Sequence, residues 1–224
     1  MRLDFISAGA AQAVVAALAA QRGIEVGGSF GAVGAMRDRF LAGEACDVLI
    51  LAQAQIAALA AEGRIADAPR ADLGAVRTGI ALRASDASPR IDTEDDVRNA
   101  FLAADALYIP DPVKSTAGIH VLKVLDLLGI GAAMEAKIRA FPNGATAMRA
   151  MCDTRGGHPV GCTQKTEILA TAGAAWIAPL MGRLELATVY SAATSAGAPA
   201  RAREFVVALG AAASRGLRTG AGFE

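Results

Sequence analysis

The sequence predicts an α/β protein of two lobes, each built on a mixed and mostly parallel sheet. Apolar, strand-like runs alternate along the chain with runs of helical periodicity, which is the pattern of strands that each lead into a helix. The alternation continues to about residue 78 and then restarts, which indicates a second lobe. With 224 residues, 54% of them hydrophobic, the chain can bury a substantial core.

The first lobe is predicted from three strands that each precede a helix. Runs rich in alanine favour helix because alanine is the best helix former. The continuous apolar run CDVLILA is typical of a buried parallel strand, and Gly63 is expected to end the third helix. The predicted strands cover 2–7, 24–31 and 46–52, and the predicted helices cover 10–21, 32–43 and 54–65.

The second lobe is predicted to repeat this order after a strand at 76–84. Thr93 is the expected N-cap of its first helix, because a threonine hydroxyl can accept a hydrogen bond from the first turn. Gly129 is expected to close the next helix. Later strands are predicted at 105–112, within 136–157, at 158–169 and at 184–195, and later helices at 115–129, within 136–157 and at 198–217.

The charge balance argues against two classes of partner. Lys and Arg together number 22, as do Asp and Glu, so the net charge is zero and gives no electrostatic basis for binding nucleic acid or a membrane surface. Aromatic residues make up only 4% of the chain, which disfavours a stacking platform for single strands. The Ala-rich stretch 8–20 is too short to span a bilayer. We therefore expect a globular protein with no nucleic-acid partner and no membrane insertion.

The three cysteines are odd in number and lack CxxC spacing, which argues against a metal cluster or a disulfide scaffold. We expect Cys152 and Cys162 to be thiols, and we expect no metal and no cofactor. No charged region precedes the apolar N-terminal segment, so this segment is not a signal peptide. A periplasmic location is expected if a leader has been removed, and a cytoplasmic one otherwise.

The stretch DPVKSTAGIHVLKVLDLLG places Lys114, Ser115 and Thr116 directly before a helix. The first turn of a helix has backbone N–H groups without intrahelical partners and the positive end of the helix dipole, so it can bind an anion. A simpler interpretation is that Ser115 or Thr116 is only an N-cap and that Lys114 is solvated. For this stretch alone the two interpretations are equally supported.

Repetition of the pattern favours the anion site. Small or polar residues lead from a strand into a helix in three further segments, 7–12, 29–36 and 162–167. In doubly wound sheets, ligands bind at the carboxyl ends of strands beside the helix N-termini. Four such ends facing one cleft would form a site for a small anion.

Several blocks of the sequence, in this order, resemble the type 2 periplasmic solute-binding proteins of the molybdate-binding kind, and especially their divergent members. The blocks are SAGAAQAV, SFGAVGAMRDRFLAGEACDVLILA, AALAAEGRI, IPDPVKSTAGIHVLKVLDLLG and PVGCTQKTEIL, followed by a late APL. The resemblance implies two α/β lobes joined by crossing strands, with an oxyanion bound in the cleft. It assigns 1–80 and 190–224 to the first lobe and 81–189 to the second, with crossing segments around 79–84 and 186–194 that act as a hinge.

The resemblance also implies ligand contacts at particular residues of this chain. These are Ser7, Ala8 and Gly9 in the first loop, Ala32 or Val33 in the second, Thr116 and Ala117 before the second-lobe helix, Gly144 within 143–145, and Gln164. Molybdate binders offer serine hydroxyls where this chain has Gly9 and Ala32 or Val33, and a tyrosine where it has Gln164. Lys114 and Lys165 add positive charge, which favours a small di- or tricarboxylic acid as the ligand.

Two functions follow from the resemblance. The first is a solute-binding protein that closes on a small anion, a molybdate-like oxyanion or a small carboxylate, and delivers it to an ABC transporter. The second is an isomerase on the same scaffold, similar to aconitate isomerase, which shifts a double bond by proton transfer. Transport-associated binding is the preferred prediction. The isomerase stays as the alternative, because a fold does not settle a function.

Few residues are candidates for acid or base chemistry. His120 lies one turn into the helix after the anion loop, and its apolar neighbours favour a packed or surface histidine. His158 lies in a Gly-Gly-His-Pro turn and is expected to be exposed. Asp111 and Glu167 border the predicted site, although Glu167 can equally be a helix N-terminal charge. The isomerase hypothesis therefore has no named catalyst.

Overall fold

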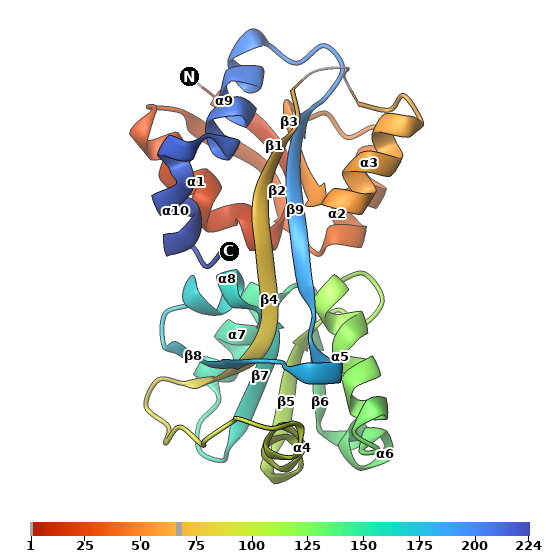
Figure 1. Cartoon of the computed structure of the whole chain (residues 1–224), viewed down its shortest axis with the longest axis vertical. Coiled ribbons are helices and arrows are strands. Elements are labelled where there is room, and N and C mark those ends of the chain that lie inside the picture. Colours follow the sequence, from red (N-terminus) through yellow and green to blue (C-terminus); the bar gives the residue numbers. More distant parts are fainter. Residues whose placement is uncertain (1, 66–68) are drawn as a thin grey trace. The chain divides into compact units, whose positions relative to one another are not determined.

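The structure of the protein is a computed structural model, and it describes residues 2–65 and 69–224. The chain divides into two compact units. Unit 1 comprises Met1–Val76 and Thr188–Glu224, and unit 2 comprises Arg77–Ala187. The chain therefore passes from one unit to the other twice, after Val76 and after Ala187 (Figure 1).

Unit 1 contains a mixed sheet in the strand order β2-β1-β3-β9-β4. β1 is parallel to β2 and β3, whereas β9 is antiparallel to β3. The ends of β1 and β2 lie side by side, because Ala8 pairs with Gly31. The strands are β1 (Arg2–Ala8), β2 (Glu25–Gly31), β3 (Val48–Ala52), β4 (Ala71–Arg83) and β9 (Ala187–Thr194).

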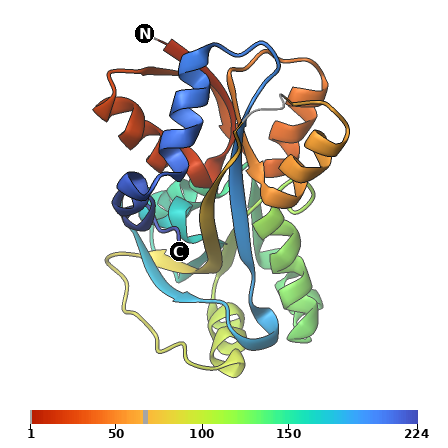
Figure 2. The same ribbon diagram turned by 45° about the horizontal axis from the view of Figure 1, so that its top comes forward.

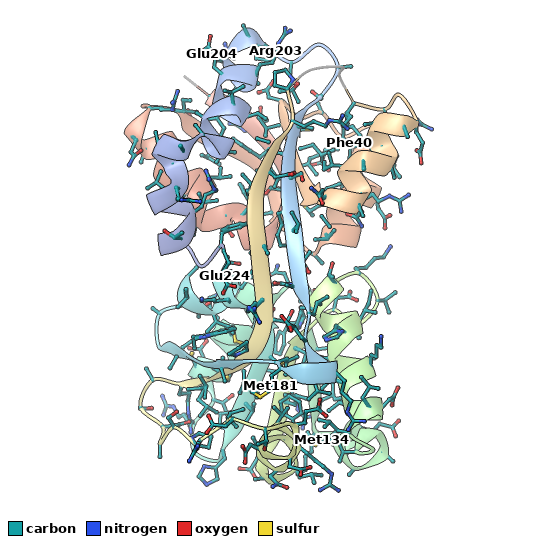
Figure 3. The ribbon with its side chains drawn as sticks, viewed as in Figure 1. Phe40, Met134, Met181, Arg203, Glu204 and Glu224 are labelled. Carbon is teal, nitrogen blue, oxygen red and sulfur yellow. The ribbon has the colours of Figure 1, made fainter. Side chains whose placement is uncertain are left out.

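Helices cover both faces of the sheet of unit 1. α1 lies with α9 and α10 on one side, and α2 and α3 lie on the other (Figures 1 and 2). Phe205 of α9 packs edge-on against Phe5 of β1, so this late helix closes the core of the first strands. Figure 3 shows the neighbouring Arg203 and Glu204 projecting outward from α9. The helices are η1 (Gly9–Ala11), α1 (Gln12–Gln21), α2 (Val33–Leu41), α3 (Gln53–Ala61), α9 (Ala200–Gly210), η4 (Ala212–Ser214) and α10 (Arg215–Gly220).

Unit 2 contains the strand order β4-β7-β5-β6, with β8 also paired to β4. β5 is parallel to β6 and β7, and β4 is antiparallel to β7 and β8. The parallel strands therefore end at one edge of the sheet, where Pro110 pairs with Phe141. The strands are β5 (Ala106–Pro110), β6 (Ile138–Phe141), β7 (Pro159–Gln164) and β8 (Ala174–Pro179).

Two separate cores cover the two faces of this sheet. Ile80 of β4 and Cys162 of β7 belong to the core that contains the buried residues of α4 and α5. Ala81 and Tyr108 belong instead to the core that contains residues of α7 and α8. The helices are α4 (Glu94–Ala103), α5 (Thr116–Leu127), α6 (Gly131–Met134), η2 (Glu135–Lys137), α7 (Gly144–Asp153), α8 (Lys165–Leu169) and η3 (Gly182–Leu184).

The α/β prediction is confirmed, and four local differences from the predicted elements are found. The predicted strand 158–169 ends at Gln164, because the next five residues form α8. The predicted helix 198–217 is interrupted at Ala211, whose extended backbone separates α9 from η4 and α10. β8 was not predicted, because its residues AAWIAP have no alternation of apolar and polar side chains. β4 also starts earlier than predicted, at Ala71.

The cysteines, the helix lengths and the grouping of His, Cys, Asp and Glu side chains can be described from the structure. Cys46, Cys152 and Cys162 are free thiols, as expected for the last two. In the described part of the chain, no helix is both long and apolar enough to cross a membrane. Within residues 2–65 and 69–224, no group of three or more His, Cys, Asp or Glu side chains is arranged to hold a metal ion.

The first prediction concerns the start of α4. Thr93 is its N-cap, as predicted: the Thr93 hydroxyl accepts from the N–H of Asp96 at 3.1 Å, and the Asp96 carboxylate accepts from the N–H of Thr93 at 2.9 Å. We expect Thr93→Ala to lower the free energy of unfolding by about 1 kcal/mol, because a first-turn N–H loses its acceptor. The measurement is urea denaturation followed by fluorescence of Trp176, which lies in unit 2.

Thr93→Ser is the matched control, because it keeps the capping hydroxyl and removes only a methyl group. It should unfold within a few tenths of a kcal/mol of the parent. Equal losses for the alanine and serine variants would contradict the capping role.

Candidate functional site

The candidate site of unit 2 lies where the parallel strands end and their connections diverge. The chain leaves β5 through α5 on one face of the sheet and leaves β6 through α7 on the other, and β5 lies between β6 and β7. In doubly wound sheets, ligands bind at such a switch point beside the helix N-termini. The loop at 111–115 follows β5, α7 follows β6 and Gln164 ends β7, so these three segments lie at the carboxyl ends of neighbouring parallel strands.

The start of α5 is held by a compact loop. The Asp111 carboxylate accepts from the N–H of Val113 at 2.7 Å and of Lys114 at 2.9 Å. The buried Ser115 is the N-cap, and its hydroxyl lies 3.4 Å from the N–H of Gly118. Ser115 therefore has the structural role that the simpler interpretation of this stretch expected, and Asp111 has a turn-forming one.

Two backbone donors remain at this helix start. Among the described residues, no acceptor is present for the N–H groups of Thr116 and Ala117. Thr116 is half-buried, and Ala117 is 1% exposed. Because these N–H groups carry the positive end of the helix dipole, they are suited to an anionic oxygen.

Thr78 and Gln164 belong to the same face of the sheet. They are paired across β4 and β7, in step with Ile80 and Cys162, which belong to the core under α5. Both side chains are almost fully buried, at 0% for Thr78 and 3% for Gln164. In the described part of the chain, the Thr78 hydroxyl has no hydrogen-bond partner. A buried hydroxyl is normally satisfied, so Thr78 is a further candidate ligand contact.

Thr78 gave no signal in the sequence. Threonine is an ordinary strand residue, and the segment around it alternates as any half-buried strand would. Only its pairing with Gln164 at the strand-end edge distinguishes it.

The opposite face of the sheet holds a buried carboxyl group. Glu167 is 7% exposed, and it accepts from the Thr163 hydroxyl at 2.7 Å and from the N–H of Gly144 at 3.2 Å. Burial raises the pKa of the Glu167 carboxyl, and the hydrogen bonds from Thr163 and from the amides of Gly144 and Ala145 oppose this rise. The predicted ligand contact Gly144 therefore donates to a side chain of the protein itself.

The other charged candidates have identifiable surroundings. The ammonium of Lys165 lies 5.6 Å from the centre of the Trp176 ring, a cation–π distance. Lys114 is exposed. The His120 ring nitrogen Nε2 is 2.8 Å from the carbonyl oxygen of Leu184, so this histidine packs against η3 as the simpler interpretation expected. His158 is exposed, also as expected.

Unit 1 presents its own helix starts at one sheet edge. The residues Ser7 to Gly9 lie next to Ala32 and Val33, because Ala8 pairs with Gly31 at the ends of β1 and β2. The Ser7 hydroxyl is buried and donates to the Ala8 carbonyl at 3.0 Å. No side chain caps the helices that begin after Ala8, Ala32 and Ala52. Backbone N–H groups are thus the donors that these starts offer.

A cavity of about 530 Å³ in unit 2 lies away from these strand ends. Its walls include Leu82 near the end of β4 and Pro159 at the beginning of β7, so it is located at the opposite edge of the sheet. Most of its lining is aliphatic, and Arg83 at its rim is bound to Asp86 and to carbonyl oxygens. Its chemistry does not suit a small anion.

Comparisons with known proteins identify one family by sequence and one fold by structure. Residues 6–224 match the family model described as bacterial extracellular solute-binding protein. The periplasmic molybdate-binding protein of Azotobacter vinelandii aligns over 99% of this chain and 98% of its own, with a TM-score of 0.77 and 18% identity. The sulfate-binding protein SubI from Mycobacterium tuberculosis H37Rv aligns over 100% and 86%, with a TM-score of 0.73 and 17% identity.

PEB3 solved with bound L-phospholactate is a third similar structure, at 14% identity, a TM-score of 0.68 and coverage of 99% of both chains. Among curated proteins, none matches the chain significantly. The structural matches confirm the predicted periplasmic-binding-protein fold. At these identities they show the fold alone.

The second prediction concerns the close approach at the start of α5. A Cβ atom on Gly118 would lie 2.3 Å from the carbonyl oxygen of Asp111 and 2.4 Å from that of Pro110. We expect Gly118→Ala to destabilise the protein, although alanine in a helix is ordinarily favoured over glycine by about 1 kcal/mol. The measurement is the Tm by circular dichroism.

Gly216→Ala in α10 is the control, since a Cβ there would have no neighbouring atom within 4 Å. It should raise the Tm or leave it unchanged. A Gly118→Ala variant as stable as this control would show that the loop at 111–115 tolerates displacement and does not fix the helix start.

Proposed function

Because the chain belongs to the family of bacterial extracellular solute-binding proteins, we propose that it binds a small anion and delivers it to an ABC-type transporter in the periplasm. The observation that carries the choice of an anion is the start of α5. There, Thr116 and Ala117 present backbone donors, and the buried hydroxyl of Thr78 is located on the same face of the sheet. The alternative isomerase activity has no support from the similar structures.

The site in unit 2 presents hydrogen-bond donors that a ligand with acceptor oxygens could satisfy. Backbone N–H groups at a helix start carry partial positive charge, and an anionic oxygen is the acceptor that complements them. The Thr78 hydroxyl and the Gln164 side-chain amide are buried polar groups on the face of the sheet that α5 covers. We infer that the ligand places one anionic group at this position.

The helix starts of unit 1 support the same choice. The three helices that follow β1, β2 and β3 begin after alanine residues, which have no side-chain acceptor to offer the first turn. Serine, threonine, asparagine and aspartate are the residues preferred at such positions. Their absence at Ala8, Ala32 and Ala52 leaves first-turn donors for another acceptor, and a bound anion is one.

The similar structures bind molybdate, sulfate and L-phospholactate by name, so they support oxyanion and carboxylate ligands alike. Closure of the two lobes on one ligand, and the part played by Lys114 and Lys165, stay predictions from the sequence.

The third prediction tests the donors of α5. A screen of molybdate, sulfate, acetate, aconitate and citrate by thermal shift should find a stabilising anion, since a ligand at 100 times its Kd adds about 2.7 kcal/mol. Thr116→Pro removes one donor at a helix position that accepts proline. We expect this variant to bind the anion with about 1.5 to 3 kcal/mol less free energy by calorimetry, the range for a hydrogen bond to a charged group.

Ala200→Pro is the matched control, because Ala200 is also the first residue of a helix and is exposed. It should leave binding unchanged. If both proline variants fold and bind the anion as the parent does, the ligand is not held by the start of α5.

The fourth prediction separates stability from binding at Thr78. Thr78→Val replaces a buried hydroxyl that has no hydrogen-bond partner among the described residues with a methyl group. We expect the free energy of unfolding to rise by about 1 kcal/mol, because an unsatisfied buried polar group is destabilising. Anion affinity should fall, because a ligand contact is lost.

Thr194→Val is the matched control for this prediction. The buried Thr194 hydroxyl also has no hydrogen-bond partner within residues 2–65 and 69–224. Thr194 lies in unit 1 and pairs with Val48, the first residue of β3, so it is distant from the carboxyl ends of the parallel strands. It should gain stability without any loss of affinity. Equal affinities for the two valine variants would remove Thr78 from the site.

A further inference from the structure

The carboxylate of Glu167 occupies a helix start that belongs to another part of the chain. Glu167 lies in the first turn of α8, yet its Oε1 accepts from the N–H of Gly144, the first residue of α7. Its other oxygen accepts from the hydroxyl of Thr163. The backbone amides can only donate, so these contacts suit an ionised carboxylate.

The backbone around this carboxylate is shaped to admit it. A Cβ atom on Gly144 would lie 2.0 Å from Oε2 of Glu167 and 2.2 Å from the hydroxyl oxygen of Thr163. Glycine at 144 is therefore required by the carboxylate and by the threonine that binds it, since the helical position itself accepts alanine. Gly144, Thr163 and Glu167 form a carboxylate pocket that the protein fills itself.

We propose that Glu167 is a specificity-determining residue whose carboxylate occupies the anion position at the start of α7 and closes it to the ligand. This inference rests on the proposed function, because it concerns the same strand-end edge of unit 2. With α7 engaged internally, the ligand of unit 2 is held at the start of α5, with Thr78 and Gln164 beside it.

Because the N–H group of Gly144 at the start of α7 is bound to Glu167, it cannot donate to a ligand, and this limits which anions fit. A tetrahedral oxyanion presents four oxygens and needs donors from several directions, whereas a carboxylate presents two oxygens in one plane. With the start of α7 closed, the donors of unit 2 are the start of α5 and the Thr78 and Gln164 side chains, which lie on one face of the sheet. Donors on one side suit the two coplanar oxygens of a carboxylate better than the four oxygens of a tetrahedral anion. The geometry therefore favours a carboxylate group over sulfate or molybdate as the group bound in unit 2.

The first arm of the test does not depend on any natural ligand. Glu167→Ala should lower the Tm, because the donors at Gly144 and Thr163 lose their acceptor. Sodium formate at pH 8 should then raise the Tm of the variant more than equimolar sodium chloride does, since formate can enter the vacated pocket. Glu135→Ala, which removes an exposed carboxylate of unit 2, is the control and should respond equally to both salts. An equal response of Glu167→Ala to formate and chloride would overturn the proposal.

The second arm measures selectivity by calorimetry with acetate and sulfate as probes. In Glu167→Ala, the sulfate-to-acetate ratio of affinities should rise by at least about tenfold over the parent, the effect of one restored charge-assisted hydrogen bond. An unchanged ratio, or no sulfate binding by the variant, would overturn the selectivity role. The proposed function fails separately if Thr116→Pro does not affect anion binding while formate still rescues Glu167→Ala.

Glu167→Gln keeps the test decisive if the alanine variant does not fold. The neutral side chain fills the same volume but is a weaker acceptor than a carboxylate. The amide proton resonance of Gly144 should therefore move upfield relative to the parent at pH 8. An unmoved resonance would show that Glu167 does not occupy the start of α7.

Discussion

The first-turn N–H groups of helices at the strand ends are the constraint on which this structure depends. Every helix start leaves donors that its own turns cannot satisfy, and parallel strands gather these starts at one edge of the sheet. A fold of this kind must supply acceptors there from side chains, from solvent or from a ligand. The helix starts whose N–H groups find no acceptor within the protein therefore indicate where it can bind an anion.

The helix starts of this chain satisfy the constraint in different ways. α4, which does not follow a strand directly, has a complete capping box between Thr93 and Asp96. α5 has a single serine cap, and α7 has both the Asn143 side chain and the distant carboxylate of Glu167. The starts in unit 1 that follow Ala8, Ala32 and Ala52 have no side-chain cap. The helix starts whose N–H groups have acceptors within the protein are structural. An external anion fits at the starts that have the fewest such acceptors.

Local sequence patterns predicted most of the fold, because helices and strands depend mainly on residues that are close together in the sequence. A short strand-like run identified β1, the continuous apolar run CDVLILA identified β3, and the Ala-rich runs identified α1 and α3. β8 was missed because its own residues, AAWIAP, begin with two alanines and have no alternation of apolar and polar side chains. The site was predictable at the α5 start, where the residues are consecutive. It was not predictable at Thr78, which is paired with the predicted contact Gln164 only through the antiparallel register of β4 and β7. The contact of Glu167 with Gly144 spans 23 positions and joins two different strand ends.

The close approach of Gly144 to Glu167 also constrains how the sequence can change over generations. Any larger residue at 144 meets the Glu167 carboxylate, so that substitution is harmful while the glutamate remains. Shortening of the glutamate, by contrast, leaves Gly144 intact and only exposes donors. The Thr163 hydroxyl would also lie 2.2 Å from a Cβ atom at 144. A lineage that enlarges residue 144 must therefore change positions 163 and 167 first.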